Sequence, residues 1–469
     1  MSHNPSEIQP LLKTDIAAAV SGEELVFRGL FWYVTVLTGL AIVAYLLVYW
    51  HTQIESQKTF PFNSIVYRAS LRFTDFTGFY HKFQSFGTAK FWTGHAVMNY
   101  PAPDAYVYLL YFRLFPQSAV AAALAFDTTI VGIAILAAGL LVWSVRRHKL
   151  AAPVAAVLAL MLLTSYPLMF MADRANVEGA AWVMALVGAW AFVKNYGRMA
   201  AICFGCVAAM KLAPLILIFL FLRRRDWRGA WTFLVAFFVI NFVAMWFAAP
   251  HIAQVLHSIG RGIKAFQNTY VLTFSPDGIG VDHSLFSVVK QVLAWGGYVN
   301  GAGLGSLLTM IGMWYHVYAM AWLMAMAMMV WHFRRMPILN CVFAVFIVQV
   351  LAPGVSFDYT LLYMYVPWAM FVIFFLLEDV YSGRVHFQLW KIVTMLVAFA
   401  ILFTPQQCYM VLNGRIGFAG QFKALTLLFL LWFVTRYAMP CRVFGETPLA
   451  AEIPTTFANP EEQPQTGTL

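Results

Sequence analysis

The chain of 469 residues is 62% hydrophobic and 11% charged, whereas soluble domains carry roughly 25% charged residues. This composition excludes a soluble globular protein, and repeated apolar runs of about 20 residues indicate an all-α polytopic membrane protein. The net charge of +10 does not indicate nucleic-acid binding, because the basic residues lie in short clusters at the ends of the apolar runs, which is a topology pattern.

The apolar runs predict about 10 to 12 membrane helices between residues 29 and 439. A polar segment, 1–28, precedes the first span at 29–50, and a Pro/Glu/Thr-rich tail, 440–469, should be disordered. Two long polar segments, 51–104 and 250–303, interrupt the apolar runs. The other complete spans are expected at 118–145, 151–171, 176–194, 228–249, 304–331, 338–353, 359–377, 388–405 and 423–439.

Clusters of basic residues predict which loops face the cytoplasm. These clusters are Arg146–Lys149, Lys194–Arg198, Arg223–Arg228, His332–Arg335 and Arg436–Arg442. All five face the cytoplasm only if residues 199–222 do not cross the membrane. Lys211 and Pro214 interrupt this segment, which predicts a re-entrant or broken helix pair, because proline removes a helical hydrogen bond.

The alternative for residues 199–222 is an ordinary Pro-kinked span, which would place Arg223-Arg-Arg225 on the outer face. With the broken pair, the outer face instead gathers the loop around Asp75, residues 172–179, the loop 250–303 and residues 352–359. The sequence therefore predicts one polar site built from four distant segments.

Asp75 is the central candidate, in a stretch, Ser64–Phe83, that predicts an interfacial helix in the first outer loop. Arg68 and Arg72 precede it by seven and three residues and would share its helix face. A carboxylate here can act as a general base, and guanidinium groups can bind a phosphate bidentately. The alternative is a surface Arg72–Asp75 ion pair that contributes little.

The rest of the first outer loop offers sugar or acceptor contacts. Trp92 and Tyr100 could stack on a sugar ring or anchor at the lipid headgroups, and His95 is either a solvated side chain or an acceptor contact. The run Tyr100-Pro-Ala-Pro103 predicts a rigid loop that starts a helix.

Arg174, Asn176 and Lys211 are further candidates on the same face. Arg174 could bind a phosphate, while Asn176 could contact a sugar or cap the helix that follows. Lys211 should lie deep in the broken helix pair, where it either pairs with an acidic side chain or reaches a lipid phosphate.

His283 and Asp358 complete the candidate set from the later loops. His283 could contact a phosphate, and Asp358 could contact sugar or acceptor, although Asp282, Ser284 and Asp358 could equally cap helices. No Walker loop, Gly-rich Rossmann turn or Asp-x-Asp metal motif is present in the outer loops, so neither a nucleotide cofactor nor a metal is expected. A sugar donor would then be carried on a lipid.

These motifs follow a characteristic order: a first-loop Asp, Tyr-Pro-x-Pro before a helix, Arg-x-Asn opening a span, and Lys-x-x-Pro before Arg-Arg-Arg-x-Trp-Arg. A His-Ser-Leu segment and Ala-Pro-Gly-Val-Ser-Phe-Asp-Tyr follow. Over residues of about 30–440 this order resembles glycosyltransferase family 87, the polyprenol-phosphate-mannose-dependent mannosyltransferases of the GT-C fold. The resemblance implies a multi-span enzyme with its site on the outer face and Asp75 as base.

The resulting hypothesis is an inverting glycosyltransferase of the cell (inner) membrane with a catalytic domain over 29–439. Its donor would be a polyprenyl-phosphate sugar, mannose or another monosaccharide, and its acceptor a lipid or glycan on the periplasmic or extracellular face. A transporter or flippase of lipid-linked sugars is the alternative, but it would require ionisable residues near the middle of several spans. A structural scaffold would leave the long polar loop unexplained.

Overall fold

The structure is a computed structural model that describes residues 72–93, 100–145, 151–249, 251–273, 282–299, 304–380, 385, 387–403, 411–412, 415–416 and 419–446. Several predicted features lie outside these residues: the N-terminal segment, the span at 29–50, Arg68, His95, the basic cluster at 146–149 and the tail from 447 onward.

The described residues are almost entirely helical, as predicted. The long apolar helices are α5 (Ala119–Val145), α6 (Ala151–Thr164), α8 (Glu178–Val193), α9 (Gly197–Met210), α11 (Trp227–Ala248), α15 (Leu304–Phe333), α16 (Ile338–Leu351), α18 (Leu389–Phe403) and α19 (Ala419–Arg436). The shorter α-helices are α2 (Thr74–Phe83), α3 (Ala89–Thr93), α4 (Ala102–Leu114), α7 (Tyr166–Arg174), α10 (Ile218–Arg223), α12 (Ile252–Phe266), α14 (Leu285–Val299) and α17 (Tyr365–Met370).

Short irregular elements connect them. The 3₁₀ segments are η2 (Ala213–Leu217), η4 (Asp358–Met364) and η6 (Arg442–Phe444), and the π-helical segments are η3 (Gln267–Val271) and η5 (Phe371–Val380). Strands β1 (Val411–Leu412) and β2 (Arg415–Ile416) form an antiparallel hairpin. The predicted span at 151–171 is divided into α6 and α7 at Ser165, which has extended backbone and precedes Tyr166-Pro167 at the start of α7.

Four stretches of the described chain are long and apolar enough to cross a membrane: Ala119–Leu140, Trp227–Ala248, Gly305–Phe333 and Asp358–Val380. Shorter apolar helices, including α8, α9, α16 and α18, pack among them. Every residue of α16 is buried, as expected for a helix that is apolar on all sides and lies at the centre of a bundle. These features confirm the predicted polytopic membrane architecture.

The predicted broken helix pair is confirmed. α9 ends at Met210, Lys211 adopts extended backbone, and η2 and α10 bring the chain back. At the far end of the pair, Arg224 Nη1 donates to the carbonyl oxygen of Phe192 at 3.0 Å and to Asn195 Oδ1 at 3.1 Å. Both ends of the segment therefore lie together, and the alternative of a single Pro-kinked span is wrong.

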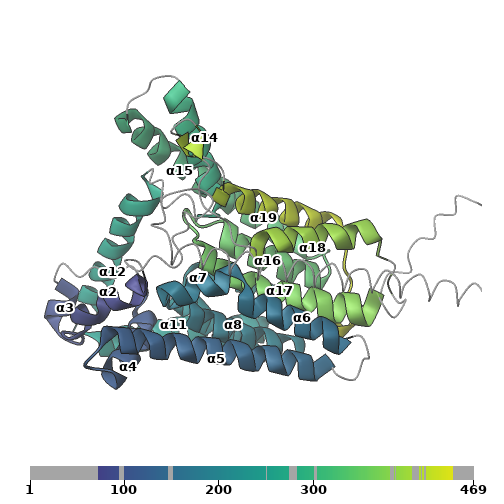
Figure 1. Ribbon diagram of the computed structural model, residues 1–469, viewed down its shortest axis with the longest axis horizontal. Helices are drawn as coiled ribbons and strands as arrows, with labels where there is room; N and C mark the ends of the chain where they lie inside the picture. The colour runs from purple at the N-terminus through teal and green to yellow at the C-terminus, as the bar shows by residue number, and fades with distance from the viewer. Residues whose placement is uncertain are drawn as a thin grey trace, which may run out of the picture.

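The basic clusters that the structure describes, which leave out residues 146–149, gather at that same end of the bundle. Arg223 donates from Nε to the carbonyl oxygen of Met336 at 2.8 Å and lies 3.7 Å from Glu446 Oε1, which also accepts from the backbone N–H of Ile338 at 2.7 Å. The opposite end carries α2, α3, α4 and α12, at the left of the view (Figure 1). α8 separates the two ends by about 24 Å at 1.5 Å per residue.

Replacing Arg225 with glycine should stabilise the protein by about 1 kcal/mol, because this exposed residue ends α10 in the left-handed region at φ 56°. The turn's bonds, from the N–H of Asp226 to the carbonyl oxygen of Phe221 and from that of Arg225 to Leu222, are kept. Thermal unfolding in detergent measures the change. Arg225→Ala removes the same charge but keeps the Cβ penalty, and a similar gain there would contradict the explanation.

Candidate active site

Residues 72–75, at the start of α2, dock side by side on residues 173–176. Arg72 Nε lies 3.9 Å from Asp173 Oδ1, and the backbone N–H of Phe73 donates to the carbonyl oxygen of Asp173 at 2.8 Å. Arg174 Nη1 donates to Thr74 Oγ1 at 2.8 Å, and Asn176 Nδ2 donates to Asp75 Oδ2 at 2.8 Å. Four consecutive residues are thus held by the end of α7 and the loop that follows it.

Backbone strain marks both partners of this docking. Phe73 has φ 57° and Ala175 has φ 50°, a left-handed conformation that costs a residue with a Cβ about 1–2 kcal/mol. Such conformations persist where surrounding contacts enforce them, and they concentrate at functional sites. The predicted helix over Ser64–Phe83 is wrong at residues 72 and 73, which form a turn, so α2 begins at Thr74.

This turn also changes the environment of Arg72. The predicted placement of Arg72 on one helix face with Asp75 is wrong, because Arg72 precedes the helix and pairs with Asp173 instead. Among the described residues, the cations that act on the Asp75 carboxylate are Arg174 and Lys211. The alternative of a surface Arg72–Asp75 ion pair is therefore wrong as well.

Asp75 is a half-buried carboxylate with cationic neighbours. Burial raises its pKa, while Arg174, the hydrogen bond from Asn176, and Lys211 oppose that rise. Its backbone carbonyl accepts from Tyr108 Oη at 3.2 Å, which fixes the main chain behind it. The result is a carboxylate that is more basic than a solvated aspartate and is kept near positive charge.

Lys211 lies at the tip of the broken helix pair and reaches the same site. Its Nζ is 3.1 Å from Glu178 Oε2 and 4.1 Å from the centre of the Tyr100 ring. Asp104 is fully buried nearby, within electrostatic range of Lys211 and Glu178. Of the two predicted alternatives the structure has the acidic pairing, yet the lysine side chain remains 18% exposed, which leaves access for a ligand.

Asn176 bonds to the first residue of α8, as its capping alternative predicts, whereas the sugar or acceptor contacts of Asn176 and Tyr100 stay predictions. Asn176 accepts from the backbone N–H of Glu178 at 2.9 Å through Oδ1 while its amide nitrogen holds Asp75, so it both starts α8 and orients the carboxylate. Burial raises the pKa of Tyr100 to about 12, so its phenol stays neutral beside Lys211. The Tyr-Pro-Ala-Pro run starts α4 at Ala102, as predicted.

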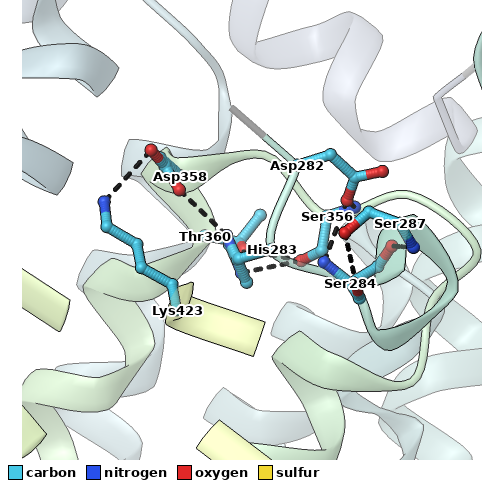
Figure 2. A network of polar contacts seen from close by, with 8 residues as sticks. All are labelled: Asp282, His283, Ser284, Ser287, Ser356, Asp358, Thr360 and Lys423. Carbon is cyan, nitrogen blue, oxygen red and sulfur yellow. Dashed lines mark hydrogen bonds and ion pairs between the residues drawn. The ribbon is translucent and has the colours of Figure 1, made fainter. Parts of the chain in front are cut away.

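A second buried network joins the later loops. Asp358 lies between Lys423 Nζ, 3.1 Å from its Oδ2, and His283 Nδ1, 3.2 Å from its Oδ1 (Figure 2). His283 Nε2 contacts the hydroxyls of Ser356 and Thr360, each at 3.1 Å. His283, Asp358 and Lys423 are fully buried. Protein partners thus surround both side chains, and the predicted contacts of His283 with phosphate and of Asp358 with sugar or acceptor stay predictions.

The backbone of the two loops is joined as well. Asp282 forms an isolated antiparallel bridge with Phe357, and its Oδ1 accepts from the backbone N–H groups of Ser284 and Ser356, both at 2.9 Å. Ser284 Oγ accepts from the N–H of Ser287 at 3.2 Å in the first turn of α14, as the capping alternative predicts. The loops thus form one rigid unit.

One face of α7 connects the two networks. Lys423 Nζ lies 4.6 Å from the centre of the Tyr166 ring, which stacks on Phe170 at 5.7 Å. The Phe170 ring contacts Tyr359 at 5.6 Å and lies 5.7 Å from the Arg174 guanidinium. The 166, 170 and 174 spacing follows the helical period, a signal that the sequence contained but that apolar packing also explains.

Trp92 has neither predicted role. It is buried, and its Nε1 donates to the carbonyl oxygen of Ala248 at 2.7 Å, so it fastens α3 to the end of α11.

Lys423 was missed by sequence reasoning, although a lysine within an apolar run is itself a signal of a functional or paired charge. Among the described residues, no group of three His, Cys, Asp or Glu side chains could hold a metal ion.

Comparison with known proteins gives one match. The model of glycosyltransferase family 87 matches residues 100–353, which is more than half of the chain. No curated protein and no solved structure gives a significant match. The matched region contains Arg174, Asn176, Lys211 and His283, and α2 with Asp75 docks directly onto it. The chain therefore belongs to glycosyltransferase family 87 and is a membrane glycosyltransferase.

Proposed function

We propose that this enzyme transfers a sugar, mannose or another monosaccharide, from a polyprenyl-phosphate donor to a hydroxyl of a lipid or glycan acceptor, with Asp75 as general base. The observation that supports this most is the docking of Asp75 beside Asn176, Arg174 and Lys211. A base for the acceptor and cations for a phosphate leaving group then face one another in one site.

In the proposed reaction Asp75 removes the proton of the acceptor hydroxyl. The acceptor oxygen forms a bond to the anomeric carbon as the bond from that carbon to the phosphate oxygen breaks, with inversion. Polyprenyl phosphate leaves with the electron pair of the broken bond. The negative charge that grows on the phosphate is stabilised by Arg174 and Lys211.

Charge and membrane chemistry support a location of the site on the outer face. The described basic clusters lie at the end of the bundle away from Asp75, and basic loops favour the cytoplasm. We therefore place the catalytic domain, 29–439, in the cell membrane with its site on the outer face. A lipid-borne donor could keep its polyprenyl chain in the membrane while its phosphate and sugar reach α2 and α7.

Arg174→Gln should lower kcat/KM by about 10²–10³-fold, because it removes a charged donor from the developing phosphate anion. Thr74→Val is the matched control, since it removes the partner of the 2.8 Å bond from Arg174 Nη1 but keeps the guanidinium. That variant should lose less than about tenfold. Equal losses in the two variants would show that the bond to Thr74, and not the charge, is what matters.

The direct test offers purified, reconstituted protein a panel of radiolabelled polyprenyl-phosphate sugars and the corresponding nucleotide sugars, with membrane lipid extract as acceptor. Transfer from a polyprenyl-phosphate sugar alone is expected. Transfer from a nucleotide sugar would overturn the donor class, and a product that keeps the donor's anomeric configuration would overturn the inverting mechanism.

A further inference from the structure

The His283 ring contacts the residues on both sides of Tyr359. Its Nδ1 contacts Asp358, the residue before, and its Nε2 contacts Thr360, the residue after, at 3.2 and 3.1 Å. Ser356 Oγ adds a bond of 2.9 Å to Thr360 Oγ1, and Lys423 holds the other oxygen of Asp358 (Figure 2). The backbone at Tyr359 is therefore fixed from two directions.

The hydrogen-bond network around His283 positions the segment that carries Tyr359 and does not itself react with substrate. Ser356, His283 and Asp358 have the connectivity of a nucleophilic triad. However, Ser356 is only 4% exposed, its hydroxyl is shared with Thr360, and Asp358 is paired with Lys423. A nucleophile must be reached by its substrate, so this connectivity serves the geometry of the segment that carries Tyr359.

Tyr359 extends from this clamp toward the Asp75 site. Its ring packs on Phe170 at 5.6 Å, on the face of α7 that also carries Arg174. Its phenol lies within electrostatic range of Asp75, Arg174 and Tyr100. Tyr359 therefore belongs to the wall of the site that holds the proposed base and the proposed phosphate ligand.

We propose that Tyr359 is a specificity-determining residue whose phenol forms a hydrogen bond with a hydroxyl of the donor sugar, and that His283 positions Tyr359 through Asp358 and Thr360. This inference rests on the proposed function. A phenol suits the task, because it combines a flat apolar ring with one hydrogen-bonding group and loses little conformational entropy on binding. A site that hydrogen-bonds a particular hydroxyl discriminates strongly against sugars that lack it.

The test combines Tyr359→Phe with a series of monodeoxy polyprenyl-phosphate sugars. The variant should lose about tenfold in kcat/KM with the natural sugar, and it should lose nothing further with the one deoxy sugar that lacks the bonded hydroxyl. Tyr365→Phe is the matched control on the same segment, since Tyr365 Oη donates to the carbonyl oxygen of Met161 at 3.5 Å. Its kcat/KM should be unchanged.

Thr360→Val tests the positioning role. It removes the hydroxyl between His283 and Ser356 without changing volume, and it should lower kcat/KM about threefold in the wild-type background but not in the Tyr359→Phe background. Suppose that the wild-type protein transfers sugar. This inference alone is then overturned if Tyr359→Phe leaves kcat/KM unchanged, or if Tyr359→Phe loses the same factor in kcat/KM with every deoxy sugar. Wild-type protein that transfers from no donor would overturn the proposed function and, with it, this inference.

Discussion

Asp75→Asn should reduce the turnover of sugar transfer by about 10²–10⁴-fold, the usual contribution of a general base. The substitution keeps size and shape, and the new amide can present its oxygen to Asn176 Nδ2, so the docking of residues 72–75 on 173–176 should persist. The loss should appear in kcat, because the proton moves in the transition state while donor binding depends on the cations.

The assay is single-turnover transfer from radiolabelled donor in reconstituted membranes, with folding verified by thermal unfolding. Asp226→Asn is the matched control, since Asp226 accepts from the backbone N–H of Gly229 at 2.8 Å and caps α11 at the far end of the bundle. It should change stability by less than about 1 kcal/mol, because asparagine caps a helix about as well as aspartate, and it should leave turnover intact. A folded Asp75→Asn protein with full turnover would rule out the proposed mechanism.

The same carboxylate predicts the pH dependence of transfer. Burial raises the pKa of Asp75 above the ordinary value of 3.8, with Arg174, Asn176 and Lys211 limiting the rise. A general base must be deprotonated, so activity should be lost as pH falls through this raised pKa, and the acid limb of kcat/KM should lie above pH 3.8. Arg174→Gln removes the largest opposing effect and should move that limb to higher pH.

Lys423→Met should destabilise the protein by about 3–5 kcal/mol, because it leaves Asp358 as a buried carboxylate without its ammonium partner. Both side chains are fully buried, and the Nζ–Oδ2 distance is 3.1 Å. Methionine fits the volume of the lysine stem, so the loss reports the missing charge and not a cavity. Thermal unfolding in detergent, followed by circular dichroism, measures it.

A double-mutant cycle separates this explanation from general damage to α19. Asp358→Asn alone should be destabilising as well, whereas Lys423→Met combined with Asp358→Asn should recover most of the loss, because no buried charge is left unpaired. Lys264→Met, on the exposed surface of α12, is the control and should change stability by less than about 0.5 kcal/mol. Additive losses in the double variant would contradict the ion-pair explanation.

The membrane fold could be predicted because local chemistry decides it. Long apolar runs must form helices in lipid, since every backbone polar group there needs an internal partner, so α5, α11, α15 and α16 begin and end within a few residues of the predicted spans. The break at Lys211-Leu-Ala-Pro214 was also readable, because proline chemistry and the positive-inside rule constrained it together. Polar side chains on the predicted outer face identified the candidate residues Asp75, Arg174, Asn176 and Lys211.

The sequence by itself thus determined the class of protein, most of the long helices and the two ends of the bundle. Only the tertiary structure decided which polar groups meet: Arg72 with Asp173, Lys211 with Glu178, and His283 with Asp358. Helix periodicity relates residues a few positions apart, whereas Asp75 and Asn176 are 101 positions apart and Lys423 and Asp358 are 65 apart. Their pairing depends on how whole helices pack, because a buried charge takes whichever partner that packing brings within reach.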